Sequence, residues 1–300
     1  MIRRVMTACA VAWMACALSL GLAGCPEEND DDASDDDAGD DDTADDDAGD
    51  DDGGDDDGGD DDGGDDDTTP PDGTLVADHG AAGDFDLIPQ AYFDQIRNDY
   101  TIFYGHTSHG SQIVSGLDVL EGEDSLYDMP SFHEISDDLG HDGDTSWVAP
   151  TEDALDTGNY NVAMWSWCGG CSDNTPKGIS TYLQAMEDLE AKYPGVLFVY
   201  MTGHLDGSGV NGTLYQSNDQ IRQYAEDHDK VLFDFADIES WDPDGNYYPD
   251  ETDYCNWCTD WCAKHECPSC GCAHSQCFNC YLKGKAWWWM MARVAGWDGT

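Results

Sequence analysis

The sequence predicts an α/β protein with a mostly parallel sheet that helices cover on both faces. Three observations support this fold class. Short apolar runs alternate with segments of helical periodicity from about residue 85 onward. One run, VLFVYM at residues 196–201, is apolar throughout, as a strand buried on both faces requires. Polar, glycine-containing stretches follow several of these runs, and parallel sheets bind ligands beyond the carboxyl ends of their strands.

The expected elements alternate along the chain between strand and helix. Apolar and aromatic runs predict strands at residues 101–104, 161–167, 196–201 and 231–235. Apolar residues spaced three and four apart predict helices at residues 112–120, 179–193, 215–227 and 283–295. The three consecutive tryptophans of the last helix, Trp287 to Trp289, are expected to pack in the core and at its rim, with carbohydrate stacking as the alternative.

The N-terminus is typical of an export signal. Residues 1–24 contain two arginines and an apolar run, and Leu22-Ala23-Gly24-Cys25 follows, with small residues before the cysteine. This ending resembles the bacterial lipoprotein processing site, and the resemblance implies lipid attachment at Cys25. The chain would then be anchored to a membrane of the cell envelope without spanning it. Pro26, where an inner-membrane retention signal would have Asp, favours the outer membrane. An ordinary secretory signal is the alternative.

An acidic tether is expected at residues 25–72. The triplet Asp-Asp-Asp recurs eight times at five-residue intervals, and residues 27–67 hold 26 acidic side chains and no basic one. Such a segment buries nothing and repels itself, which predicts a disordered spacer; weak binding of divalent cations is the alternative. An acidic spacer of this kind also favours display of the folded domain on the outer face of the cell. The net charge of −54 argues against nucleic acid and anionic lipid surfaces as partners. Residues 73–300 suffice for one domain.

The cysteines are concentrated near the C-terminus, eight of them in a Cys-rich segment at residues 255–280. Export to an oxidising compartment favours disulfides, and no metal or other cofactor is expected. Zinc is the alternative, because three Cys-x-x-Cys pairs lie near His265 and His274. The disulfide candidates are Cys168, Cys171, Cys255, Cys258, Cys262, Cys267, Cys270, Cys272, Cys277 and Cys280.

Polar loops follow the predicted strands and should meet at one edge of the sheet. The three loops contain GHTSHG at residues 105–110, CGG at 168–170 and TGHLDG at 202–207. A serine on a sharp turn after a strand can act as a nucleophile when a base lies within hydrogen-bond reach. We therefore expect Ser108 to be the nucleophile and His274, just before the last helix, to be its base.

Several stretches resemble the SGNH (GDSL-type) hydrolase superfamily, and an uncharacterised branch of exported bacterial proteins in particular. They are YGHTSHGSQI, MWSWCGG, FVYMTGHLDG, DFADIESWDPDG, and AHSQ with ARVAGWDG, within about residues 85–300. The resemblance implies a flavodoxin-like three-layer α/β/α fold. It also implies a serine esterase that acts on ester or acyl groups of a small molecule or glycan.

The same resemblance implies roles for individual residues. Ser108 and His274 would be catalytic. The oxyanion hole would comprise the Ser108 backbone N–H, Gly169 or Gly170, and Asn174. The superfamily has Asp three residues before the histidine, where this chain has Gly271. The acid of the triad therefore stays open, with Asp253 and Asp260 as candidates.

Other interpretations of these residues remain open. Ser108 could cap a helix. His274 could bind zinc or support a ligand, and His204 could simply pack at the edge of the sheet. Residues 242–246 are similar to a calcium loop, although Tyr247 stands where the EF-hand turn needs glycine. The alternative function is a catalytically inactive surface binding module on the same scaffold.

Overall fold

The computed structural model of the chain describes residues 73–300. The predicted signal peptide (1–24), the lipid-attachment residue Cys25 and the predicted tether (25–72) lie outside the described residues. None of the described helices is both long enough and apolar enough to cross a bilayer.

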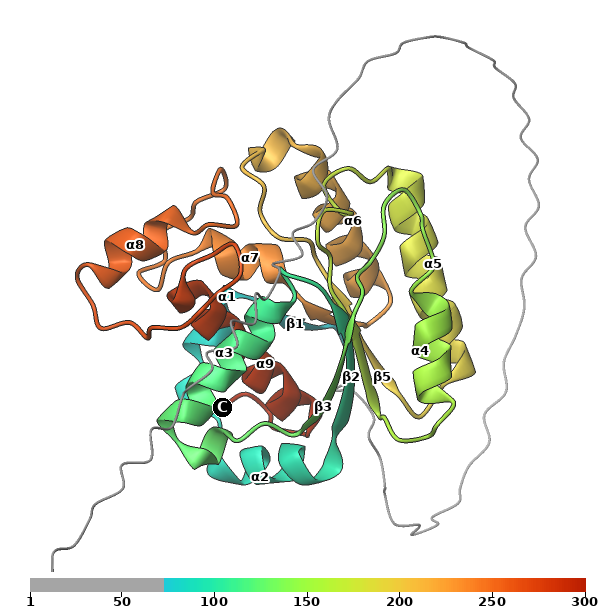
Figure 1. Cartoon of the computed structure of the whole chain (residues 1–300), viewed down its shortest axis with the longest axis horizontal. Helices are drawn as coiled ribbons and strands as arrows, with labels where there is room; N and C mark the ends of the chain where they lie inside the picture. Colours follow the sequence, from blue (N-terminus) through green and yellow to red (C-terminus); the bar gives the residue numbers. More distant parts are fainter. Residues whose placement is uncertain (1–72) are drawn as a thin grey trace, which may run out of the picture.

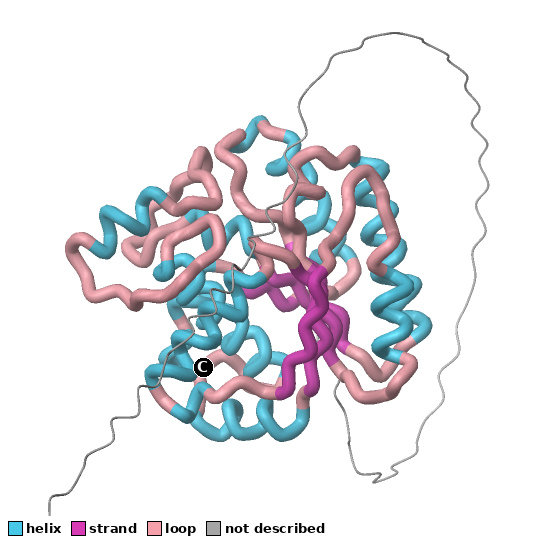
Figure 2. The backbone as a smooth tube through the Cα atoms, viewed as in Figure 1, coloured by secondary structure: helices cyan, strands magenta, loops and turns pink. Residues whose placement is uncertain are grey.

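The core of the fold is a six-stranded sheet in which every neighbouring pair of strands is parallel (Figures 1 and 2). The strand order is β1-β6-β5-β4-β2-β3. The strands are β1 (Leu75–Ala77), β2 (Thr101–His106), β3 (Ser131–Ser136), β4 (Val162–Trp165), β5 (Leu197–Met201) and β6 (Val231–Phe233). The chain places β3 on one side of β2 and then returns to place β4 on its other side, with β5 beyond β4. The carboxyl ends of β2, β4 and β5 are therefore adjacent. In parallel sheets, ligands bind beyond the carboxyl ends of the strands at such a change of direction.

Helices cover both faces of this sheet, so the predicted three-layer α/β fold class is confirmed (Figure 1). One face carries α1 (His79–Gly83), α2 (Gln90–Asp99), α3 (Ser111–Glu123) and α9 (Cys277–Val294). The other carries α4 (Val148–Leu155), α5 (Pro176–Lys192) and α6 (Thr213–Asp227). Two further helices, α7 (Phe235–Ser240) and α8 (Asn256–Cys262), lie in the connection from β6 to α9.

Helix α9 is the most deeply buried helix of the first face, as its three tryptophans predict. Trp287 and Trp288 are completely buried in the core. The backbones of α9 and α3 touch at a pair of glycines: a Cβ on Gly116 would lie 1.9 Å from the Cys280 carbonyl oxygen, and a Cβ on Gly284 would lie 2.5 Å from the Gly116 carbonyl carbon. This close approach fixes the start of α9 against the helix that follows Ser108.

The two edge strands were not predicted from the sequence. Strand β3 is exposed or half-buried along its length and contains His133, Glu134 and two serines, so it lacks an apolar run. Strand β1 has only three residues. The predicted interior strands, in contrast, are almost wholly buried.

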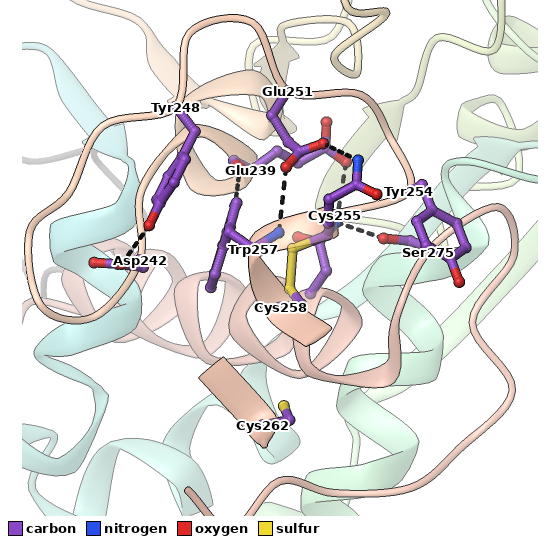
Figure 3. The surroundings of a disulfide bond; sticks show 12 residues. Glu239, Asp242, Tyr248, Glu251, Tyr254, Cys255, Trp257, Cys258, Cys262 and Ser275 are labelled. Atoms are coloured by element: carbon purple, nitrogen blue, oxygen red, sulfur yellow. Dashed lines mark hydrogen bonds between the residues drawn. A yellow bond between two sulfur atoms is a disulfide. The ribbon is translucent and has the colours of Figure 1, made fainter. Parts of the chain in front are cut away.

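The Cys-rich segment is held by disulfides, as export predicts. The four pairs are Cys255–Cys258, Cys262–Cys267, Cys270–Cys277 and Cys272–Cys280. Figure 3 shows the first of them at the start of α8. Because these eight sulfurs are bonded in pairs, the zinc alternative is wrong for them.

Cys171 corrects the list of disulfide candidates, because it is a free, buried thiol. Its sulfur lies 3.3 Å from Asn218 Oδ1. The side chain packs against Gly203, where an added Cβ would lie 2.6 Å from Cys171 Cβ and 3.1 Å from its sulfur. Burial raises the pKa of this thiol to about 12. Cys171 therefore stays protonated and serves as a packing residue.

Candidate active site

Ser108 lies in the short turn that joins β2 to α3, at the carboxyl edge of the sheet. It is not the N-cap of α3, because Gly110 holds that position; the Ser108 carbonyl instead accepts a 2.6 Å hydrogen bond from Ser111 Oγ. Gly110 has an ordinary φ of −62°. A side chain there would lie 2.1 Å from Ser166 Oγ, so close packing, rather than an unusual turn, requires this glycine.

A buried histidine, His109, is the centre of the site. Only 6% of its surface is exposed. Its Nε2 lies 3.0 Å from Asp253 Oδ2. Its ring is stacked on His204 at a centroid distance of 3.6 Å and on His274 at 4.4 Å. We call His109, His204, His274 and Asp253 the histidine cluster; it joins the loop after β2, the loop after β5 and two segments of the β6–α9 connection.

The electrostatics of the cluster favour a neutral His109 and an ionised Asp253. Burial, reinforced by the charges of His204 and His274, lowers the pKa of His109 to about 4 against the opposing effect of Asp253. Burial alone would raise the pKa of Asp253, but the hydrogen bond from His109 and the three nearby histidines outweigh it and hold this pKa below its usual value. At neutral pH, His109 therefore donates its Nε2 proton to Asp253, which leaves Nδ1 as an acceptor.

The sulfur of Cys168 connects Ser108 to this cluster. It lies 3.6 Å from Ser108 Oγ and 3.5 Å from His109 Nδ1. The structure thus brings Ser108, Cys168 and three histidines together at one edge, as the converging loops predict.

His274 is held in an uncommon backbone conformation. Its φ is +59°, in the left-handed region that few residues other than glycine adopt. The disulfides Cys270–Cys277 and Cys272–Cys280 bracket it on both sides. Such conformations persist where the surroundings enforce them, and they occur often at functional sites.

A buried ion pair lies beneath the histidine cluster. Lys283 Nζ and Glu239 Oε1 are 2.7 Å apart, and both side chains are fully buried. Glu239 Oε2 accepts a 2.7 Å hydrogen bond from the backbone N–H of Leu205, next to His204. Lys283 also donates to Gln112, whose Nε2 donates to the Ala273 carbonyl, next to His274. The pair therefore anchors two of the three histidine-bearing loops.

Two further hydrogen bonds tie this ion pair to the Cys-rich segment. Trp257 of α8 donates from Nε1 to the Glu239 carbonyl at 2.9 Å (Figure 3). Asn279 of α9 donates from Nδ2 to Glu239 Oε1 at 3.3 Å. The same amide nitrogen also donates to Ser275 Oγ, on the residue after His274, at 2.8 Å. The buried charges, the disulfides and α9 thus hold the His274 loop together.

The residues predicted for the oxyanion hole lie in the loop after β4. Asn174 is buried, its Nδ2 donates to the Gly170 carbonyl at 2.8 Å, and its Oδ1 accepts from the Thr175 N–H. Gly170 packs against the Leu139 and Gly140 carbonyls, while a Cβ on Gly169 would meet only the edge of His141. The contacts of Asn174 close its own loop, and the oxyanion role of these three residues stays a prediction.

The sequence pointed to Ser108 and His274 but missed His109 as the central residue. Along an extended segment His109 would point away from Ser108, but the turn after β2 instead directs His109 into the cluster. His106 points elsewhere, with its Nε2 2.8 Å from Glu134 Oε2. Of the two candidate acids, Asp253 joins the cluster, whereas Asp260 is an exposed residue of α8.

The cluster fits a hydrogen-bonded stack better than a metal site. Donor atoms of His109, His204 and Asp253 lie within 4.8 Å of one another. The two imidazoles, however, are stacked 5° from parallel. An ion shared by both would lie well out of each ring plane, whereas the imidazole lone pair lies in the plane.

The loop at residues 242–246, which is similar to a calcium loop in sequence, is closed by hydrogen bonds to one of its own side chains. Asp242 accepts hydrogen bonds from the backbone N–H groups of Asp244 and Asn246, and from the Tyr248 hydroxyl. Its carboxylate thus closes the turn itself.

Comparison with known proteins gives little that bears on activity. No family model matches this chain, and no curated protein matches it. A crystal structure of a predicted acylhydrolase from Bacteroides fragilis is similar over 53% of this chain and 82% of that chain, with 10% identity and a TM-score of 0.32. So low a TM-score supports no argument about activity.

Proposed function

We propose that the protein is a hydrolase that cleaves acyl esters, with Ser108 as its nucleophile. The observation that supports this most directly is the position of Ser108 beside three stacked histidines and an ionised aspartate at the carboxyl edge of a parallel sheet.

Ser108 Oγ would attack the acyl carbonyl carbon while His274 accepts the serine proton. The tetrahedral intermediate would collapse by breaking the bond to the alcohol oxygen, which takes that proton from His274. Water would then release the acyl group by the same two proton transfers. Asp253 lies close enough to His274 for their charges to interact, so it would stabilise the protonated imidazole in place of the acid missing at Gly271.

A fluorophosphonate probe tests this proposal. We expect the oxidised protein to form one adduct, on Ser108, located by peptide mass spectrometry. The adduct should be absent in Ser108→Ala, formed at least about a hundredfold more slowly in His274→Gln, and unchanged in Ser180→Ala on the outer helix α5. Folded protein that fails to react would contradict the proposal.

The second candidate is a binding module on the same scaffold. It is favoured by Asn174, whose amide atoms bond within their own loop. It predicts ligand binding by the wild-type protein with no adduct on Ser108.

We also propose that the enzyme is attached to a membrane of the cell envelope by lipid at Cys25, with the acidic segment as its spacer. The sequence Leu22-Ala23-Gly24-Cys25 supports this. Metabolic labelling with an alkyne fatty acid should mark the wild-type protein and leave Cys25→Ser unmarked. Equal labelling of the two would argue against attachment there.

A further inference from the structure

A cavity of about 260 Å³ lies beside the histidine cluster, at the carboxyl ends of β5 and β6. Its wall contains Leu205 and Glu251. These residues belong to the two segments that carry His204 and Asp253, and the segments are joined by a hydrogen bond from the Gly207 N–H to the Glu251 carbonyl. The cavity and the cluster therefore share a wall, and a ligand in the cavity would be held next to the cluster.

The cavity has an aromatic platform. Trp241 is stacked with His79, at a centroid distance of 4.6 Å and an interplanar angle of 15°, and with Tyr247, at 4.7 Å and 29°. Tyr247 lines the cavity and is 45% exposed. Tyr215, from the first turn of α6, also lines the cavity and is 39% exposed. Exposed aromatic rings that line a cavity are typical of binding sites.

The platform is rigid before any ligand binds. Trp241 and Tyr247 form a β-bridge at the two ends of the turn that Asp242 closes. Arg222, also in the lining, is fixed by two hydrogen bonds to the buried Asp234. Binding therefore orders few side chains, which lowers its entropic cost.

The polar lining selects the kind of ligand. Four acidic residues line the cavity: Asp206, Asp219, Asp237 and Glu251. The charge of Arg222 is already balanced by Asp234. This excess of carboxylates disfavours an anionic ligand. A quaternary ammonium ion is bound by aromatic rings on several sides, whereas Trp241 and Tyr247 are nearly parallel and offer one flat face. Flat aromatic faces with carboxylate acceptors suit the apolar face and the hydroxyl groups of a sugar ring.

We propose that this cavity binds one neutral sugar unit of an oligosaccharide or polysaccharide, stacked on Tyr247. If the protein is the hydrolase proposed above, the sugar belongs to the substrate, and the acyl ester that is cleaved is an ester of a carbohydrate. Tyr247 and Tyr215 would then determine specificity, while Ser108 and the histidine cluster would perform the reaction.

Isothermal titration calorimetry on the whole chain carrying Ser108→Ala tests the proposal without turnover. The probes are neutral hexasaccharides of β-1,4-linked glucose, xylose, mannose and N-acetylglucosamine, each at millimolar concentration. At least one should bind, and Tyr247→Ala and Tyr215→Ala should each weaken binding about tenfold or more. Tyr247→Trp should retain it. Tyr254→Ala removes a tyrosine that is 51% exposed and does not line the cavity, so it should leave binding unchanged.

The outcomes separate this proposal from the hydrolase function. Failure of all four hexasaccharides to bind would overturn the sugar site, even if the fluorophosphonate adduct forms on Ser108. Binding of choline in their place, or equal loss of binding in Tyr254→Ala, would overturn it too. Sugar binding that depends on Tyr247, together with an absent adduct, would retain the site and refute only the hydrolase.

Discussion

Replacing Lys283 by methionine is expected to lower the free energy of unfolding by about 3–5 kcal/mol, because it leaves the Glu239 carboxylate buried without its cation. Both side chains are fully buried, and Lys283 Nζ also lies 4.0 Å above the Phe235 ring. Burial lowers the pKa of Lys283 while Glu239 opposes it. Urea denaturation followed by circular dichroism measures the change.

A nearby lysine provides the matched control. Lys285, two residues further along α9, has a 3.9 Å contact with the exposed Asp86 and lies over the rings of Phe85 and Tyr281. Lys285→Met leaves no buried charge without a partner, so it should cost less than about 2 kcal/mol. Equal destabilisation by the two substitutions would contradict the role given to the buried pair.

The double variant Lys283→Met/Glu239→Gln separates stability from positioning. It removes both buried charges, so it should recover much of the stability that the single variant loses. It also weakens the bonds that anchor the loops of His204 and His274. Fluorophosphonate labelling of Ser108 should therefore be slower in the double variant than in the wild type, although the double variant is folded.

Acidification from pH 6.5 to pH 4 is expected to remove on the order of 3 kcal/mol of stability through His109 alone. Burial lowers the pKa of His109 to about 4, whereas the ordinary value is 6.5. Between these values the unfolded chain binds a proton that the folded chain does not, so stability falls as the pH falls. The lowered pKa of Asp253 adds a loss only at still lower pH, below its unfolded value.

Urea denaturation of the wild type and His109→Gln at several pH values tests this. The variant lacks the proton-linked loss, so its stability should depend less steeply on pH across this window. His228→Gln is the control, because His228 is exposed and contacts only its own helix end. A wild-type pH dependence that survives in His109→Gln would show that His109 is not the group responsible.

The interior of the fold could be predicted from the sequence because its signal is local. The runs that form β4 and β5 are buried on both faces and are therefore apolar at nearly every position. The edge strand β3 was missed for the same reason: it is stabilised by pairing with β2 and not by burial of its own side chains. The disulfides were predicted from the cysteine count and the expected export signal, although their pairing and the free Cys171 were not.

The sequence by itself determined the fold class, the edge at which Ser108 and His274 lie, and the Cys-rich segment. Only the tertiary structure decided that His109 is the centre of the cluster, that Asp253 and not Asp260 contacts it, and that Lys283 pairs with Glu239. Asp253 is 144 residues from His109, and Lys283 is 44 from Glu239. Periodicity and motifs report which face a residue takes within its own element. Contacts between such distant side chains arise only when the sheet order and the packing of α9 bring their loops together.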